Sequence, residues 1–220
     1  MPFAVTAAFQ EKRRADIRAG QASDTLLLLE HDAVITLGKS AQPDHVLHSE
    51  TYLAKQGISL HRASRGGDVT FHGPGQLVGY PIIRLRTGVR TYVEAMARAI
   101  VEVLADLGVT AWYRKEAPGL WVDADVPGGE AKICAFGVNI HHRITMHGFA
   151  LNLDPDLEAF GMIVPCGLAG CAVTSVRALR GSTPSPHLLS ARVAESLGTH
   201  LRVAFAAGGA LTNCFAQQGH

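Results

Sequence analysis

The sequence predicts an α+β protein in which a mixed or antiparallel β-sheet is flanked by helices. Short runs of aliphatic and β-branched residues outnumber the segments with helical periodicity along the 220 residues. The helical segments do not alternate regularly with the strand signals, as they would in a doubly wound sheet. We expect a single domain over residues 1–220, since 47% of the residues are hydrophobic and a chain of this length buries roughly 70% of its unfolded surface in one core.

Strand signals and one short helix fill the first part of the chain. The strand signals lie at residues 26–29, 34–37 and 58–61. The first two are continuous apolar runs, which are typical of buried strands. Before the third, the segment SETYLAKQG predicts a helix with Ser49 as its N-cap and Gly57 as its stop.

The clearest helix pattern covers residues 91–108, where apolar residues recur at helical spacing up to Gly108. A second amphipathic helix is predicted over residues 186–205. Short strands are predicted between these helices, at residues 111–113, 120–122, 132–139 and 149–153. The strands again outnumber the helices, which favours the α+β class.

Charge and hydropathy exclude several classes of partner. The chain has 20 basic and 19 acidic residues, a net charge of +1, whereas nucleic-acid binding calls for a clear basic excess. No apolar run approaches the roughly 18 residues of a membrane span. The first residues lack the layout of a signal peptide. We therefore expect a cytoplasmic protein with no nucleic-acid or membrane partner.

Familiar nucleotide and metal motifs are incomplete in this sequence. Residues 38–40, Gly-Lys-Ser, resemble the end of a P-loop, but Ala33 stands where the first glycine is needed. Residues 73–79 miss the dinucleotide fingerprint by one residue and contain a proline. None of the 11 histidines has the spacing of a known metal site. We expect no metal and no bound cofactor.

The segment RGGDVTFHGPGQ, residues 65–76, is the strongest ligand-binding signal. Its glycines let the backbone lie close to a ligand. Interleaved with them are a cation, a hydroxyl, an imidazole and an amide, at Arg65, Thr70, His72 and Gln76. A purely structural hairpin has no need of that polar set, so the segment predicts a binding loop.

The four cysteines form no CxxC pair and indicate no disulfide framework. Cys166 lies between Pro165 and Gly167, in a predicted loop that holds a thiol beside backbone amides. A thiol needs a neighbouring group to ionise at neutral pH. The residues alone leave packing and catalysis equally open for Cys166.

Taken together, these segments resemble the lipoyl(octanoyl) transferase family of lipoate biosynthesis. The matching motifs are RGGDVTFHGPGQ with the YPI that follows it, KICAFGV from Lys132, HGFALN from His147, and PCG around Cys166. The resemblance covers about residues 24–205. It implies the α+β catalytic domain that this family shares with biotin and lipoate protein ligases.

The resemblance implies transfer of an octanoyl group from octanoyl-acyl carrier protein to a lysine of a lipoyl domain, without a cofactor. The implied acceptors are lipoyl domains of 2-oxoacid dehydrogenase E2 subunits and the glycine cleavage H protein. By the same resemblance, Cys166 carries the acyl group as a thioester and Lys132 is the general acid and base. A lysine amine is more basic than a cysteine thiol, so a close pair favours thiolate and ammonium.

The resemblance also implies where the substrate binds. The implied contacts are Arg65, Gly66, Gly67, Asp68, Val69, Thr70, Phe71, His72, Ala135, Phe136, Gly137, Gly148, Phe149 and Ala150. The small residues in this set leave room for an apolar acyl chain.

Other interpretations remain open from the residues. One is an ATP-dependent lipoate or biotin protein ligase on the same fold, and another is a non-catalytic protein that binds acylated carriers or lipoyl domains. Cys134 is a rival nucleophile because it lies two residues from Lys132 in a predicted strand. The chain also departs from the family at Asp32 and Ala33, where two prolines are common, and its N-terminal helix looks short.

Overall fold

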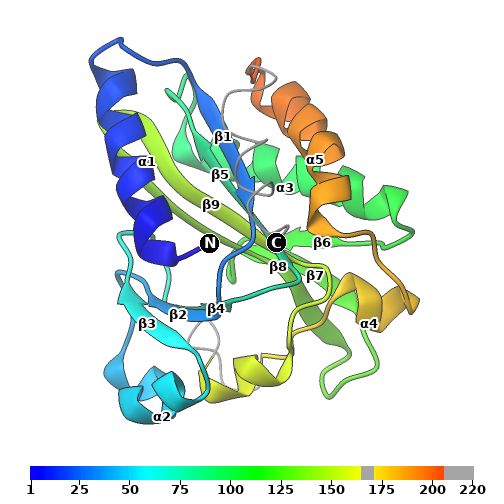
Figure 1. Cartoon of the computed structure of the whole chain (residues 1–220). Coiled ribbons are helices and arrows are strands. Elements are labelled where there is room, and N and C mark those ends of the chain that lie inside the picture. Colours follow the sequence, from blue (N-terminus) through cyan, green and yellow to red (C-terminus); the bar gives the residue numbers. More distant parts are fainter. Residues whose placement is uncertain (165–170, 206–220) are drawn as a thin grey trace.

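Six antiparallel strands form the large sheet of the protein, in a computed structural model that describes residues 1–164 and 171–205 (Figure 1). In spatial order they are β1 (Thr25–Leu29), β5 (Gln76–Ile82), β9 (Ile144–Asn152), β8 (Glu130–His141), β7 (Gly119–Asp123) and β6 (Trp112–Arg114). Each strand is antiparallel to its neighbour. Both β5 and β9 are buried along their whole length, because the sheet is covered on both faces.

A second, three-stranded sheet lies beside the first and makes the architecture mixed. Its order is β3 (Ser59–Arg62), β2 (Val34–Leu37) and β4 (Val69–His72), with β2 parallel to β3 and antiparallel to β4. Its own small core includes the rings of Phe71 and Phe160, which meet edge to face at 5.4 Å. The expected α+β fold with a mixed or antiparallel sheet flanked by helices is therefore confirmed.

Helices α3 (Val89–Asp106) and α5 (Pro186–Leu201) pack together on one face of the large sheet (Figure 1). Successive side chains of a strand point to opposite faces, so Leu26 and Leu28 of β1 join this helical core. Both helices appear where the sequence predicts them, although α5 ends at Leu201 rather than at residue 205.

Helix α1 (Phe3–Arg18) covers the opposite face of the sheet (Figure 1). Its Ile17 packs with Leu27 and Leu29 of β1. The expectation of a short N-terminal helix is wrong, since α1 has 16 residues. Its buried stripe includes the polar Thr6 and Gln10. The helical spacing of the buried positions is therefore not visible as a spacing of apolar residues in the sequence.

In the described part of the chain, four shorter elements lie between β2 and β3 and between β9 and α5. They are η1 (Pro43–His45), α2 (Glu50–Lys55), η2 (Glu158–Met162) and α4 (Val176–Arg180). Ser49 caps α2 as predicted, with its hydroxyl oxygen accepting the Tyr52 N–H at 3.3 Å. Among the described residues, no helix is long and apolar enough to cross a bilayer.

Candidate active site

A pocket of about 600 Å³ lies along one edge of β8. On this edge the pairing of β7 with β8 extends only as far as Gly119, which lies opposite Ala135. No described strand therefore pairs there with residues 136–138 of β8. The loop 65–68, the start of α3 and residues 115–118 enclose the space instead. The missing strand partner is therefore what makes room for a ligand.

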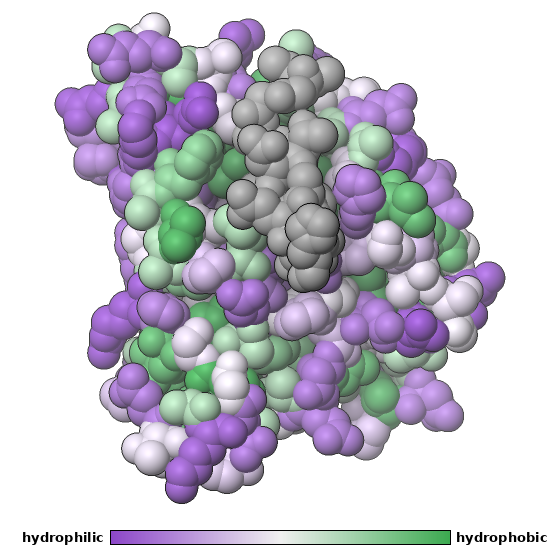
Figure 2. Space-filling view, in the orientation of Figure 1, coloured by the Kyte–Doolittle hydropathy of each residue, from purple (hydrophilic) through white to green (hydrophobic). Residues whose placement is uncertain are grey.

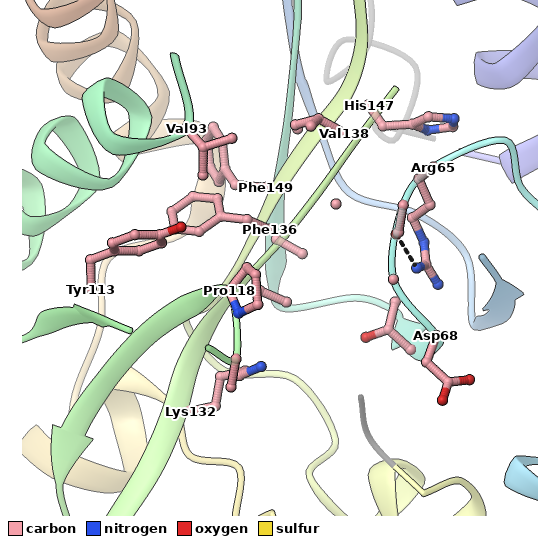
Figure 3. Close-up of a pocket in the computed structure, with 18 of the residues that line it drawn as sticks. Arg65, Asp68, Val93, Tyr113, Pro118, Lys132, Phe136, Val138, His147 and Phe149 are labelled. Atoms are coloured by element: carbon pink, nitrogen blue, oxygen red, sulfur yellow. Dashed lines mark hydrogen bonds between the residues drawn. The ribbon is translucent and has the colours of Figure 1, made fainter. Parts of the chain in front are cut away.

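The two walls of the pocket differ in character. Figure 3 shows Val93, Tyr113, Phe136 and Phe149 gathered on one side, while Arg65, Asp68 and His147 lie on the other. The rings of Tyr113 and Phe136 are 6.1 Å apart. Such a site can hold an apolar tail against one wall and hydrogen-bond a polar group on the other.

Arg65 organises the polar wall through its side chain. Its guanidinium donates to the backbone oxygen of Thr36 at 2.6 Å and to the hydroxyl of the same residue at 2.8 Å. The next residue, Gly66, donates its N–H to the carbonyl of Val138 at 2.9 Å, which ties the loop to β8. A Cβ on Gly137 would lie 3.0 Å from Arg65 Cδ, so the glycine admits the arginine stem.

Residues 38–40 support this loop and give the P-loop-like sequence a structural explanation. Gly38 donates its N–H to the carbonyl of Asp68, and Ser40 donates to that of Gly67, both at 3.1 Å. A Cβ on Gly38 would lie 2.2 Å from the Gly67 oxygen. The glycine therefore serves a close backbone approach.

His72 is held as a neutral imidazole. Gln76 donates its amide to the side-chain oxygen of Asn152 at 2.9 Å, so its own oxygen accepts the Nδ1 proton of His72 at 2.7 Å. Asn152 in turn donates to the carbonyl of Thr174 at 3.0 Å. Burial lowers the pKa of His72 well below its ordinary value. Nε2 of this ring is therefore an acceptor.

Tyr80 has a similarly defined role in the polar wall. His31 donates its Nδ1 proton to the backbone oxygen of Met1 at 3.0 Å, so its Nε2 accepts the Tyr80 hydroxyl at 2.7 Å. Burial, ahead of other causes, lowers the pKa of both His31 and His147 to about 4. At neutral pH the histidines around the Arg65 cation are therefore uncharged hydrogen-bonding groups.

Lys132 lies on β8 at the base of the pocket, with only 4% of its surface exposed (Figure 3). Its Nζ is 5.0 Å from the centroid of the Trp121 ring. A Cβ on Gly119 would lie 2.9 Å from Lys132 Cε, so this glycine leaves space for the lysine stem. The Lys132 backbone accepts from Thr174 and donates to Ala172, at 3.0 and 2.9 Å. Residues 172–174 are therefore fixed alongside the lysine.

Cys166 lies outside the described residues. The described chain reaches Val164, whose N–H donates to the carbonyl of His45 at 2.9 Å, and resumes at Cys171. Six residues after Cys166, Ala172 accepts the Lys132 N–H. The segment that contains Cys166 is thus joined to residues that contact the backbone of Lys132.

Cys134 is a poor nucleophile in this structure. It has no exposed surface, and its side chain belongs to the core beneath α3. Burial raises the pKa of its thiol strongly. Because the thiolate is the reactive form, the geometry does not favour the rival assignment of Cys134.

The structure gathers nearly all of the predicted substrate-binding residues in one place. Every one of them except Phe71 lines the pocket, as Lys132 does. Phe71 faces the other side of β4, where it packs against Phe160 in the small sheet. Strand alternation separates it from Thr70 and His72, which both line the pocket.

Sequence reasoning missed residues that other elements bring to the pocket. Phe3 comes from α1, Val93 from α3 and Tyr113 from β6. None of them belongs to a motif, so only the topology reveals them. The YPI that follows the glycine-rich segment was a signal for Tyr80. Within the described residues, no group of three histidine, cysteine or acidic side chains is placed to hold a metal.

Known proteins resemble this chain over most of its length. The family described as "Lipoyl protein ligase A/B catalytic domain" matches residues 2–198. A protein of Chloroflexus aurantiacus named octanoyltransferase is 44% identical over 202 residues, which are 89% of each chain. One of Solibacter usitatus with the same name is 46% identical over 180 residues, 80% of this chain and 79% of that one. A Myxococcus xanthus octanoyltransferase is 45% identical over 77% of this chain, which spans 47% of that longer protein.

Solved structures share the fold at low sequence identity. The bipartite lipoate protein ligase of Thermoplasma acidophilum superposes with a TM-score of 0.70 at 18% identity, over 90% of this chain and 80% of that one. Lipoate-protein ligase A bound with ATP superposes with a TM-score of 0.69 at 19% identity, over 90% and 81%. At these identities the likeness concerns the fold alone.

Proposed function

Because the chain belongs to the lipoyl protein ligase A/B catalytic domain family, we propose that it is an octanoyltransferase. It moves an octanoyl group from octanoyl-acyl carrier protein to a lysine of a lipoyl domain, as in 2-oxoacid dehydrogenase E2 subunits and the glycine cleavage H protein. The observation that carries the proposal is the pocket, which combines an apolar wall with a buried lysine. The relatives named octanoyltransferase support the choice of acyl group.

The acyl chain binds along the apolar wall, against Val93, Phe136 and Phe149. At ~30 Å³ for each carbon atom, the volume of a water molecule in the liquid, the eight carbons of an octanoyl group occupy roughly 240 Å³. The pocket of about 600 Å³ accommodates them. Burial of each methylene contributes about 0.8 kcal/mol. Small residues such as Ala135 and Ala150 keep this wall open.

In the first half-reaction the thiolate of Cys166 attacks the carbonyl carbon of the octanoyl thioester. A new carbon–sulfur bond forms to Cys166, and the bond to the carrier sulfur breaks. Lys132, as ammonium, gives its proton to the departing thiolate. The products are an octanoyl-Cys166 thioester, a free carrier thiol and a neutral Lys132 amine.

In the second half-reaction the amine of the acceptor lysine attacks the octanoyl-Cys166 thioester. Neutral Lys132 takes the proton that this nitrogen loses as the amide bond forms. Cys166 leaves as the thiolate, which restores the starting pair. A thioester is already activated, so the cycle uses no ATP.

Mass spectrometry of the intact protein tests this function. After incubation with octanoyl-acyl carrier protein, we expect one added octanoyl group, which peptide mapping assigns to Cys166. Adding an apo lipoyl domain should remove the group from the enzyme and place it on the domain. If product formed only with octanoic acid and ATP, and Cys166→Ala kept full activity, the protein would be a ligase.

A further inference from the structure

A basic patch lies on the surface between the end of α1 and the turn that joins β8 to β9. Its polar lining consists of Glu11, Arg14, Arg18, His141 and His142, around a hollow of about 470 Å³. Figure 2 shows hydrophilic side chains gathered over the C-terminal end of α1, at the upper left of the view. The basic patch is separate from the lining of the main pocket.

Positive charge in the basic patch is only partly neutralised. Arg14 forms an ion pair with Glu11 at 2.5 Å. In the described part of the chain, no carboxylate lies within ion-pair distance of Arg18. The charge of Arg18, followed by those of His141 and Arg14, lowers the pKa of His142. Like charges crowd here, which favours an anionic partner.

The turn beside the basic patch keeps a strained backbone. His142 and Arg143 have φ values of 51° and 61°, in the left-handed region. Two-residue hairpin turns of this kind favour Asn-Gly, because other side chains clash with their own backbone there. A histidine and an arginine therefore occupy these positions against the local conformational preference, and the Arg143 guanidinium holds the turn by donating to the Leu85 carbonyl at 3.0 and 3.2 Å.

Hydrogen bonds connect the basic patch to the main pocket. Arg14 donates to the side-chain oxygen of Asn139 at 3.0 Å, and Asn139 donates to the carbonyl of Ser64 at 2.7 Å. The Ser64 hydroxyl lies 3.1 Å from Nε2 of His147, which lines the pocket. Along β8, the patch residue His141 is only about 10 Å from Val138 at the pocket wall. The patch therefore borders one end of the pocket.

We propose that the basic patch docks the acidic carrier domain that delivers the acyl thioester, an inference that rests on the proposed octanoyl transfer. The pocket runs along β8 from Val138, at the end that the patch borders, to Lys132, six residues or about 20 Å away. A carrier domain seated on the patch presents its thioester on a phosphopantetheine arm, whose extended length is similar to that span. A lysine side chain of an acceptor domain docked there is several times too short to reach Lys132. The geometry thus fits the donor.

Charge reversal tests the docking surface. The variant Arg18→Glu/His142→Glu changes two exposed side chains outside the hydrogen-bonded path to the pocket. We expect kcat/KM for octanoyl-acyl carrier protein to fall at least tenfold, while kcat/KM for octanoyl-pantetheine changes less than twofold. In wild type, adding the carrier should raise the NMR-measured pKa of His142, because carboxylates favour its charged form.

Arg98→Glu/His187→Glu is the matched control, with the same residue types and the same change in charge on α3 and α5. In this control, kcat/KM should stay at the wild-type value for both donors. If the patch variant lowers kcat/KM equally for both donors, or for neither, the docking proposal is overturned while the proposed octanoyl transfer stands. A raised KM for the lipoyl domain with octanoyl-pantetheine as donor assigns the patch to the acceptor and also overturns it. If wild type transfers from neither donor, the proposed function fails, and the docking proposal with it.

Discussion

Lys132 owes its position to the small residue beside it. Gly119 on β7 has no side chain, so the lysine stem passes over it toward the Trp121 ring. A Cβ at Gly119 would also lie 2.7 Å from the backbone oxygen of Cys134, which cannot rotate away. The position of the amine therefore depends on a residue that takes no part in the chemistry.

Gly119→Ala should lower kcat by at least tenfold and leave KM within about threefold. In the proposed mechanism the added methyl displaces the Lys132 amine from the reacting atoms, and a displacement of about 1 Å costs on the order of 10²-fold, while the proposed acyl-binding wall is unchanged. Steady-state kinetics with octanoyl-pantetheine measure both constants. Gly161→Ala, where a Cβ meets nothing within 4 Å, is the control and should behave as wild type. A wild-type kcat for Gly119→Ala would contradict this account.

Cys134→Ala should retain octanoyl transfer and lose about 1 kcal/mol of stability, because it only empties a small buried volume. Cys166→Ala should form no octanoyl adduct under the same conditions. Intact-mass analysis and a urea titration measure the two effects. An adduct on Cys166→Ala that disappears in the double variant with Cys134→Ala would transfer the role of nucleophile to Cys134.

Motifs predict single residues of the pocket well where those residues are close in sequence. The segment RGGDVTFHGPGQ predicts Arg65 and His72 because its polar groups have no other use in a hairpin. Val93 and Tyr113 carry no such signal, since a valine in a helix and a tyrosine in a short strand are ordinary core residues. Their place in the pocket follows only from how α3 and β6 pack against β8.

At the scale of elements, α3 and α5 are joined by a cluster of charged groups. Glu102 accepts hydrogen bonds from Arg192 at 2.5 Å, His200 at 2.8 Å and Ser196 at 3.1 Å. Arg192, as the largest cause, helps to lower the pKa of the Glu102 carboxyl from 4.5 to about 2. A carboxyl whose pKa is lower in the folded than in the unfolded state stabilises the fold at pH values above its unfolded-state pKa. That stabilisation is lost as the pH falls toward the folded-state pKa.

Glu102→Gln should therefore reduce stability at neutral pH, and the difference from wild type should shrink as the pH falls from about 4.5 toward 2. Urea titrations at closely spaced pH values measure the two free energies of unfolding. His200→Asn removes one donor and should give a smaller difference of the same sign at neutral pH. A difference that stays constant down to pH 2 would show that the carboxylate charge is not involved.

Elements were predictable where their caps and turns follow common rules. Ser49 and the apolar period of residues 91–108 predicted α2 and α3. The hairpin of β8 and β9 was predicted too short at the ends that meet, because His142 and Arg143 form its turn without a glycine or asparagine. Helix α1 was underestimated because its buried face contains Thr6 and Gln10.

At the scale of the whole molecule, the pocket joins parts of the chain that are far apart in sequence. Phe3, the loop 65–68, Tyr113 and residues 135–138 all contribute to one lining. No single segment forms the site by itself, so a ligand that binds there stabilises the folded state of the whole chain. The resemblance predicted the family and fold, but only the assembled chain brings these parts together.

Octanoylation should raise the melting temperature of the protein by roughly 5 °C or more, because burial of only three methylenes contributes about 2.4 kcal/mol and 1 kcal/mol corresponds to about 2–4 °C in a chain of this size. The buried acyl chain adds contacts that exist only in the folded state. Scanning calorimetry before and after incubation with octanoyl-pantetheine measures the shift. Cys166→Ala should show none, and an unchanged melting temperature in acylated wild type would mean that the chain stays in solvent.

The unpaired edge of β8 has a second consequence, for storage of the enzyme. No described strand of the large sheet pairs with residues 136–138 on this edge, where the Val138 carbonyl accepts the Gly66 N–H instead, and edges without a strand partner template pairing between molecules. While the pocket is empty, the enclosing loop 65–68 and α3 are what keep a foreign strand away. Aggregation during concentration should therefore begin with molecules in which this enclosure has opened, and a bound acyl chain protects against it.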